Sequence, residues 1–114
     1  MPFEGNSMYR PLPKGITIGQ SQIEGLGLLA TEKIAADTVL GIAHIANSNF
    51  PHGYVRTALG AFYNHSDIPT CKLLDGYWQH MKVKYLMTVK DIEPGEELTA
   101  TYSLYESEFE SELL

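Results

Sequence analysis

Three short stretches, far apart in the chain, carry residues that could bind a small polar ligand. The first, residues 24–30, places two glycines beside an apolar run. The second, residues 58–69, ends an apolar segment with the tripeptide Asn-His-Ser. The third, residues 92–102, combines a turn rich in glutamate with a short run that ends in a tyrosine. Each stretch alone also fits ordinary turn or capping chemistry, so the functional argument depends on their combination.

The chemistry available to the first two stretches is ligand binding rather than acid–base catalysis. Gly25 and Gly27 would let a backbone approach a ligand closely, although glycines near a turn are more often plain turn residues. The third glycine of a nucleotide-binding loop is missing. Asn64 offers both a donor and an acceptor, which suits a zwitterionic small molecule. In the structural alternative, the polar residues at 64–66 cap a helix end.

The elements that must position these residues are mostly strands. Period-two apolar patterns predict strands over residues 16–18, 26–31, 38–45 and 81–89, and a further strand over 98–102. In the longest run, one face would carry the apolar residues Met81, Val83, Tyr85, Met87 and Val89. Asp75-Gly76 predicts a hairpin turn between residues 71–74 and 77–89.

One segment departs from the strand pattern. Val55, Leu59 and Phe62 are spaced i, i+4, i+7, which predicts a short helix within residues 51–62. Ser48 or Asn49 could cap it.

Together, in this order and spacing, the three stretches resemble the SET-domain family of protein lysine methyltransferases. Gly25-Leu26-Gly27 is similar to the family's Gly-x-Gly stretch, and Asn64-His65-Ser66 with Pro69 is similar to its Asn-His-Ser/Cys-x-x-Pro motif. Gly95-Glu96-Glu97-Leu98 followed by Tyr102 is similar to its Gly-Glu-Glu-Leu-x-x-x-Tyr motif. The resemblance covers residues 15–102.

The resemblance implies a role for each matching residue. S-adenosylmethionine would be the cofactor, bound by the residues Gly25, Leu26, Gly27, Asn64 and His65. Tyr102 would be the catalytic residue that orients the amine and the methyl group. Tyr105 and Tyr54 are expected to line the substrate channel, and Tyr63 is expected in the core. No metal site is expected. The sequence departs from the family pattern at Leu26, Thr70 and Thr101.

The resemblance also implies a fold and a domain layout. We expect a mainly β, SET-domain (β-clip-like) fold of short strands and small sheets, with one short helix and a knot-like threading of the carboxyl-terminal segment. Residues 1–13 would form an extended lead-in, residues 14–105 the SET domain and residues 106–114 an acidic tail.

Composition limits the partners. The 114 residues have room for one domain, and the single cysteine, Cys71, excludes an internal disulfide and a cysteine-rich zinc cluster. The net charge of −6 argues against direct nucleic-acid binding, and no segment suggests a membrane span. Residues 91–114 carry eight carboxylates and no Lys or Arg. This acidic end could attract a basic polypeptide, or it could be a solvated tail.

These observations lead to one expected function and two alternatives. The expected function is methylation of lysine in a basic protein segment, such as a histone-like tail, by an intracellular enzyme with a possible homodimeric state. One alternative is a catalytically weak SET fold that serves as a basic-peptide-binding module, for which the departures at Leu26, Thr70 and Thr101 leave room. The other is a structural or assembly protein that reuses the β fold.

Overall fold

The computed structural model describes residues 11–50 and 53–101. Within them the chain forms eight strands and one short helix. In chain order these elements are β1 (Ile16–Gln20), β2 (Leu26–Ala30), β3 (Val39–Ala46), β4 (Tyr54–Arg56), α2 (Ala58–Phe62), β5 (Asn64–His65), β6 (Cys71–Trp78), β7 (Met81–Thr88) and β8 (Glu97–Ala100). The prediction of a mainly β fold with one short helix is confirmed for this part of the chain.

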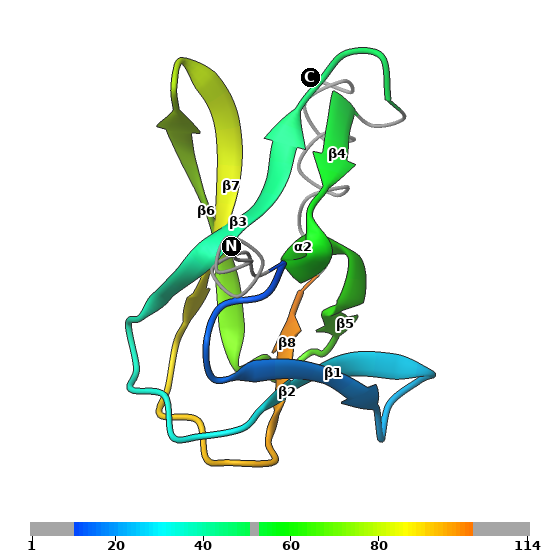
Figure 1. The fold of residues 1–114 in the computed structure, drawn as a ribbon, viewed down its shortest axis with the longest axis vertical. Coiled ribbons are helices and arrows are strands. Elements are labelled where there is room, and N and C mark those ends of the chain that lie inside the picture. The colour runs from blue at the N-terminus through cyan, green and yellow to red at the C-terminus, as the bar shows by residue number, and fades with distance from the viewer. Residues whose placement is uncertain (1–10, 51–52, 102–114) are drawn as a thin grey trace, which may run out of the picture.

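The strands form two four-stranded sheets. One sheet has the order β1-β2-β8-β5, and the other has the order β4-β3-β7-β6. Figure 1 shows the β6–β7 hairpin extending away from the sheet that contains β1 and β2, while α2 lies between β4 and β5. All neighbours pair antiparallel except β5 and β8, which pair in parallel. The sheet that carries the motif residues is therefore assembled from both ends of the described chain.

The core lies between the two sheets and is built from small and branched apolar side chains. Leu28 on β2, Leu86 on β7 and Leu98 on β8 are fully buried in one cluster. The connections that precede β3 and β8 are joined by a backbone bridge between Ile34 and Ile92, with N···O distances of 2.9 and 2.7 Å. Burial of these side chains contributes the main favourable part of the free energy of folding.

The hairpin predicted at Asp75-Gly76 is wrong. β6 runs through both residues, and the turn falls at Gln79-His80, whose φ angles of 49° and 68° give the backbone that a two-residue hairpin turn needs. Gly76 has a packing role instead, because a Cβ there would lie 2.7 Å from the Tyr85 ring. Asp75 faces Lys84 across the strands and forms an ion pair with it.

The helix predicted within residues 51–62 is correct only in its second half. Residues Tyr54–Arg56 pair with β3 as strand β4. The helix begins after Thr57, whose side chain accepts a hydrogen bond from the Gly60 amide. Thr57 Oγ1 also donates to the Ile42 carbonyl at 2.6 Å, which joins the cap to β3. The strand forms because it completes a sheet edge, which local spacing does not reveal.

The apolar face predicted for residues 81–89 is also only partly correct. Val83 is buried, but the next buried positions are Leu86 and Thr88. The buried face of β7 therefore switches from odd-numbered to even-numbered residues. The pairing of β7 with β3 shifts register twice, between Val39 and Gly41 and between Ile42 and His44. Such irregularities increase local twist, which explains why a simple alternation does not hold along β7.

Some predictions fall on residues outside the described ranges. These are the lead-in before residue 11, the acidic tail from residue 106 and the knot-like threading of the carboxyl-terminal segment. In the described part of the chain, no helix has the length and apolar character needed to cross a membrane.

Candidate functional site

The sheet order brings the three motif stretches to one place. β8 pairs with β2 on one side, with Leu28 opposite Leu98, and with β5 on the other, with Asn64 opposite Thr99. Figure 1 shows β8 running between these two strands. Residues that are more than 30 positions apart in sequence thus become neighbours, because a single strand from the third stretch pairs with the other two.

The loop that precedes the Gly-x-Gly stretch is fixed by Ser21. Its Oγ accepts hydrogen bonds from the amides of Ile23 at 2.8 Å and Glu24 at 3.1 Å, and its own amide donates to the Gly25 carbonyl at 2.8 Å. Gly25 has a φ of +53°, which a residue with a side chain adopts only at a cost. The β1–β2 loop is therefore held by the hydrogen bonds of Ser21 and by the glycine conformation at residue 25.

The side-chain amide of Asn64 points into this loop. Its Nδ2 lies 3.0 Å from Ser21 Oγ, 3.2 Å from the Glu24 carbonyl, 3.3 Å from the Leu26 carbonyl and 2.8 Å from Glu97 Oε2. These neighbours are acceptors, which assigns this end of the amide as nitrogen. Its Oδ1 accepts no hydrogen bond from the described residues. The donor side is fixed and the acceptor side is available to a ligand.

Two residues of this cluster escaped the sequence analysis. Ser21 Oγ lies 2.9 and 2.8 Å from the two carboxylate oxygens of Glu97, and it also meets the Asn64 amide. Glu97 carried a signal, since it belongs to the Gly-Glu-Glu-Leu motif, but the motif alone does not say which glutamate faces the site. Ser21 carried none, because its contact with Glu97 spans 76 positions.

At Gly27 the cluster occupies the space that a side chain would fill. A Cβ at this position would overlap Glu97 Oε2 and lie 3.0 Å from Asn64 Nδ2. Glycine therefore suits the two positions for different reasons: Gly25 has a positive φ angle, and Gly27 is closely packed. By contrast, the Leu26 side chain is 56% exposed and turned away from the core.

The structure describes only some of the other predicted site residues. His65 pairs with Ala100 through the backbone, and its Nε2 lies 3.1 Å from Asp67 Oδ1. Tyr102 and Tyr105 lie outside the described residues. The last described residue, Thr101, donates from its Oγ1 to the Ser66 carbonyl at 3.2 Å. The chain therefore runs beside the Asn-His-Ser segment up to residue 101.

The departure from the family pattern at Thr70 has a clear structural role. Its Oγ1 accepts from the Thr99 amide at 3.0 Å and donates to the Glu97 carbonyl at 3.1 Å. The Thr70 amide in turn donates to Thr99 Oγ1 at 3.1 Å. This pair ties the segment after the Asn-His-Ser tripeptide to β8, so threonine keeps that connection.

A buried aromatic cluster lies next to the site. His44 is only 2% exposed, and its Nε2 is 3.1 Å from the hydroxyl of Tyr63, the residue before Asn64. The rings of Tyr54 and Tyr63 both meet the His44 ring edge-on, with centroids 6.3 and 5.9 Å away. The prediction that Tyr63 is a core residue is confirmed. Tyr54 lies in this cluster, one ring removed from the segment that carries Asn64.

The buried His44 makes the stability depend on pH. Burial, reinforced by the positive charges of Arg56 and Lys84, lowers its pKa from 6.5 to about 4. Between these values the unfolded chain binds a proton that the folded chain excludes. The contribution of neutral His44 to the free energy of unfolding is therefore fully present above pH 6.5 and is lost as the pH falls toward 4. The loss should reach roughly 3 kcal/mol. Chemical denaturation of wild type and His44→Gln at several pH values measures it.

The exposed histidine at the hairpin turn provides the control for this prediction. His80→Asn should keep the wild-type dependence, while His44→Gln should lose the part that lies between pH 6.5 and 4. A wild-type unfolding free energy that stays constant over this interval would show that His44 is not excluded from protonation by the fold.

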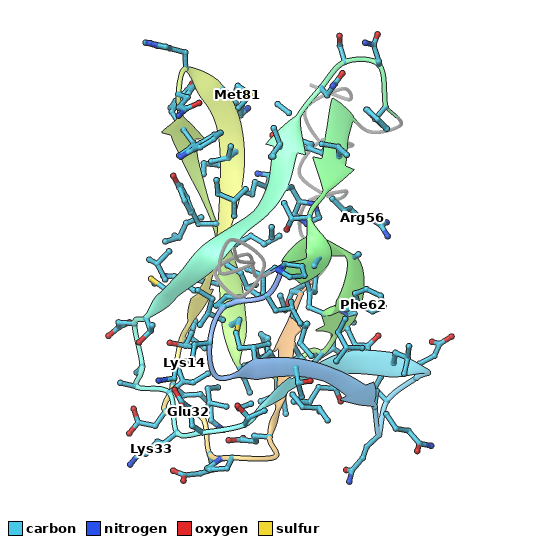
Figure 2. The ribbon with its side chains drawn as sticks, in the orientation of Figure 1. Lys14, Glu32, Lys33, Arg56, Phe62 and Met81 are labelled. Atoms are coloured by element: carbon cyan, nitrogen blue, oxygen red, sulfur yellow. The ribbon has the colours of Figure 1, made fainter. Side chains whose placement is uncertain are left out.

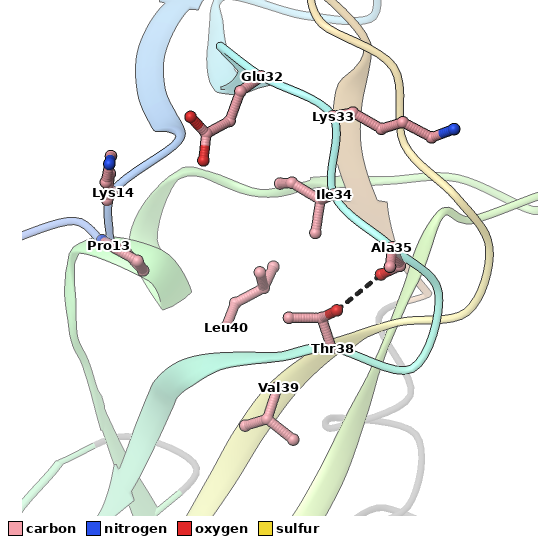
Figure 3. Close-up of a pocket in the computed structure, with 9 residues that line it drawn as sticks. All are labelled: Pro13, Lys14, Glu32, Lys33, Ile34, Ala35, Thr38, Val39 and Leu40. Carbon is pink, nitrogen blue, oxygen red and sulfur yellow. Dashed lines mark hydrogen bonds between the residues drawn. The ribbon is translucent and has the colours of Figure 1, made fainter.

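A pocket lies away from these motif residues. It has a volume of about 350 Å³ and is lined by Pro13, Lys14, Glu32, Lys33, Ile34, Ala35, Thr38, Val39 and Leu40. Figure 3 shows the charged groups of Lys14, Glu32 and Lys33 around its edge, and Figure 2 places these residues on the part of the molecule below the β6–β7 hairpin. None of the motif residues lines this pocket.

Comparison with known families decides what this arrangement belongs to. The model of the SET domain matches residues 43–103, which is 61 of the 114 residues. The chain belongs to the SET-domain family. No curated protein matches the sequence.

Solved structures share this SET-domain fold. A candidate histone methyltransferase of Plasmodium falciparum is 24% identical, with a TM-score of 0.65 over 80% of this chain and 95% of that chain. The Chaetomium thermophilum Polycomb Repressive Complex 2 bound to GSK126 is 21% identical, with a TM-score of 0.67 over 89% of this chain. The match covers 17% of that larger chain. At these identities the similarity establishes only the fold, and the activity has to be inferred from the residues of the site.

Proposed function

We propose that this SET-domain protein is an S-adenosylmethionine-dependent lysine N-methyltransferase that acts on a basic protein segment. The observation that carries the proposal is the convergence of Gly25, Gly27 and Asn64 around one polar cluster. This set of acceptors fits the amino-acid end of the cofactor, because backbone carbonyls, a carboxylate and an amide oxygen can all accept from an ammonium group. The family, and the Plasmodium neighbour named as a candidate histone methyltransferase, support lysine methylation as the reaction class.

The residues of this chain would act mainly by positioning. When bound, S-adenosylmethionine would supply a methyl group that passes directly to the amine, with the neutral thioether S-adenosylhomocysteine as the leaving group and no covalent enzyme intermediate. Asn64 and the Gly25–Gly27 backbone hold the amino-acid end, and His65 contributes backbone contacts. Tyr102, assigned by its motif, orients the incoming amine. An apolar channel would favour the neutral form of lysine and so prepare it for attack.

The acidic end of the chain supports a basic acceptor. Residues 91–114 have a charge of −8, while the rest of the chain has +2, which sums to the net −6. Asp91 and Glu93 are exposed on the described surface close to β8. Such a charge distribution steers a lysine-rich segment toward the site and raises its association rate at low salt.

A methyl-transfer assay tests the proposal. Wild type with methyl-labelled S-adenosylmethionine should label lysine in histones, detected by mass spectrometry, and should leave acidic proteins unlabelled. Tyr102→Phe should lower the rate at least about a hundredfold, since misplacing the amine has effects of that size. Tyr77→Phe removes a hydroxyl from a side chain that is 72% exposed on the hairpin, and should leave the rate unchanged.

The same assay distinguishes a methyltransferase from the alternative, a peptide-binding module. A wild type that binds a basic peptide but transfers no label from saturating cofactor would be a peptide-binding module, and the enzymatic proposal would be wrong. Association of two copies is a separate proposal, in which a second subunit would close the acceptor channel. Light scattering at micromolar concentration checks it, and a monomer there would count against it.

A further inference from the structure

The polar cluster beside Asn64 contains more acceptors than donors. An amide NH₂ group has two hydrogens, yet four acceptors lie within 3.3 Å of Asn64 Nδ2. We call Ser21 Oγ, the Glu24 and Leu26 carbonyls and the Glu97 carboxylate the acceptor cluster. At any moment at least two of its four members receive no hydrogen from Asn64. Ser21 Oγ already accepts from the amides of Ile23 and Glu24, so the capacity for an additional donor lies with the two carbonyls and the carboxylate.

Glu97 gives the acceptor cluster a negative charge. Its carboxylate is half-buried, and its side-chain partners are the neutral groups Ser21 Oγ and Asn64 Nδ2. None of the ion pairs among residues 11–50 and 53–101 includes Glu97. A half-buried carboxylate beside two carbonyl oxygens, with no cation paired to it in the described part of the chain, favours a ligand that is both positively charged and a hydrogen-bond donor.

The geometry around Glu97 is held by the fold. Ser21 fixes one side of the carboxylate and is itself fixed by the amides of Ile23 and Glu24. On β8, Glu97 lies opposite Leu29, and its own carbonyl accepts from Thr70. Gly27 makes the space for the carboxylate on that strand, since a Cβ there would overlap Glu97 Oε2. A charge held in place in this way binds a partner with little loss of side-chain entropy.

We propose that Glu97 recognises the α-ammonium group of S-adenosylmethionine, and thereby makes the site selective for ligands that carry this group. An ammonium has three N–H donors and one positive charge, which matches the unsatisfied members of the acceptor cluster. Asn64 Oδ1 is available as a further acceptor. This inference rests on the proposed function, and it assigns to Glu97 a ligand-binding role in addition to its place in the strand.

The test compares two ligands that differ only in the amino group. S-adenosylhomocysteine carries it, and the deamino analogue of S-adenosylhomocysteine does not. Wild type should bind S-adenosylhomocysteine at least about tenfold more tightly, because charge-assisted hydrogen bonds have effects of that size. Calorimetry measures the stronger ligand, and competition against it measures the weaker one.

Two glutamate variants complete the experiment. Glu97→Gln keeps the shape of the side chain and removes its charge, so it should weaken S-adenosylhomocysteine about tenfold and leave the deamino analogue nearly unchanged. Glu96→Gln removes the same charge one position earlier, where the side chain pairs with Lys90 at 3.4 Å. It should leave both affinities unchanged.

The outcomes are distinguishable. If wild type binds neither ligand, the proposed cofactor site itself is wrong. If wild type binds S-adenosylhomocysteine and Glu97→Gln binds it equally well, the site stands and the role of Glu97 is overturned. Equal weakening of both ligands by Glu97→Gln would also overturn it, since that result shows a purely structural effect. If Glu96→Gln weakened S-adenosylhomocysteine binding as much as Glu97→Gln does, the cause would be net charge, and a specific contact with Glu97 would be ruled out.

Discussion

Replacing Asn64 with alanine should weaken binding of S-adenosylmethionine by between about tenfold and a hundredfold, because the ligand loses a polar partner in a half-buried site. The change removes Oδ1, which accepts no hydrogen bond from residues 11–50 and 53–101, and it also removes the donor that holds the Glu24 and Leu26 carbonyls and Glu97 together. Isothermal titration calorimetry of wild type and variant measures the difference.

The control for this prediction is an asparagine in an exposed turn. Asn49→Ala makes the same chemical change in the segment after β3, where the side chain is exposed, and should bind the cofactor like wild type. Circular dichroism should show that both variants keep the β fold. An Asn64→Ala protein that is folded and binds with wild-type affinity would remove Asn64 from the site.

Replacing Gly60 with alanine should cause the largest loss of stability. Gly60 lies in the middle of α2, where a Cβ would overlap the Ala43 carbonyl oxygen and lie 2.9 Å from the carbonyl carbon. The obstacle is backbone of a paired strand, so it cannot move as a side chain would. We expect a loss of about 3 kcal/mol, which is large beside the stability of a typical small domain. The midpoint of thermal unfolding should fall by roughly 10 °C.

A neighbouring change in the same helix separates packing from helix propensity. Ala61→Gly alters an exposed position of α2 and should cost only about 1 kcal/mol. Alanine is intrinsically the better helix former, so propensity alone would make Gly60→Ala stabilising. An unchanged or higher unfolding midpoint for Gly60→Ala would show that α2 does not approach β3 as closely as described.

Motif spacing predicted the general location of the site because its residues sit on strands with clear apolar patterns. Residues 26–31 and 38–45 were predicted as strands, and they correspond to β2 and β3 with ends shifted by one residue. The parallel pairing that sets Asn64 beside β8 could not be derived from periodicity, which carries no information on partners. The resemblance to a family implied only that the motif stretches meet at one site.

The errors came from positions where a tertiary contact overrides a local preference. Asp75-Gly76 has the composition of a hairpin turn, yet the Tyr85 ring occupies the space over Gly76 and Lys84 pairs with Asp75, so the strand continues. The turn forms at Gln79-His80 although neither residue is a strong turn former. Ser21 was missed for a related reason: its partner Glu97 is close only after β1, β2 and β8 have paired in one sheet.

A crystal structure of the protein with S-adenosylhomocysteine would test the central claim most directly. We expect ligand density against the β1–β2 loop and β5, with the amino-acid end within hydrogen-bond distance of Asn64 and the carbonyls of Glu24 and Leu26. Ligand density in the pocket between Lys14 and Leu40 instead, or an empty Asn64 site at saturating ligand concentration, would contradict it.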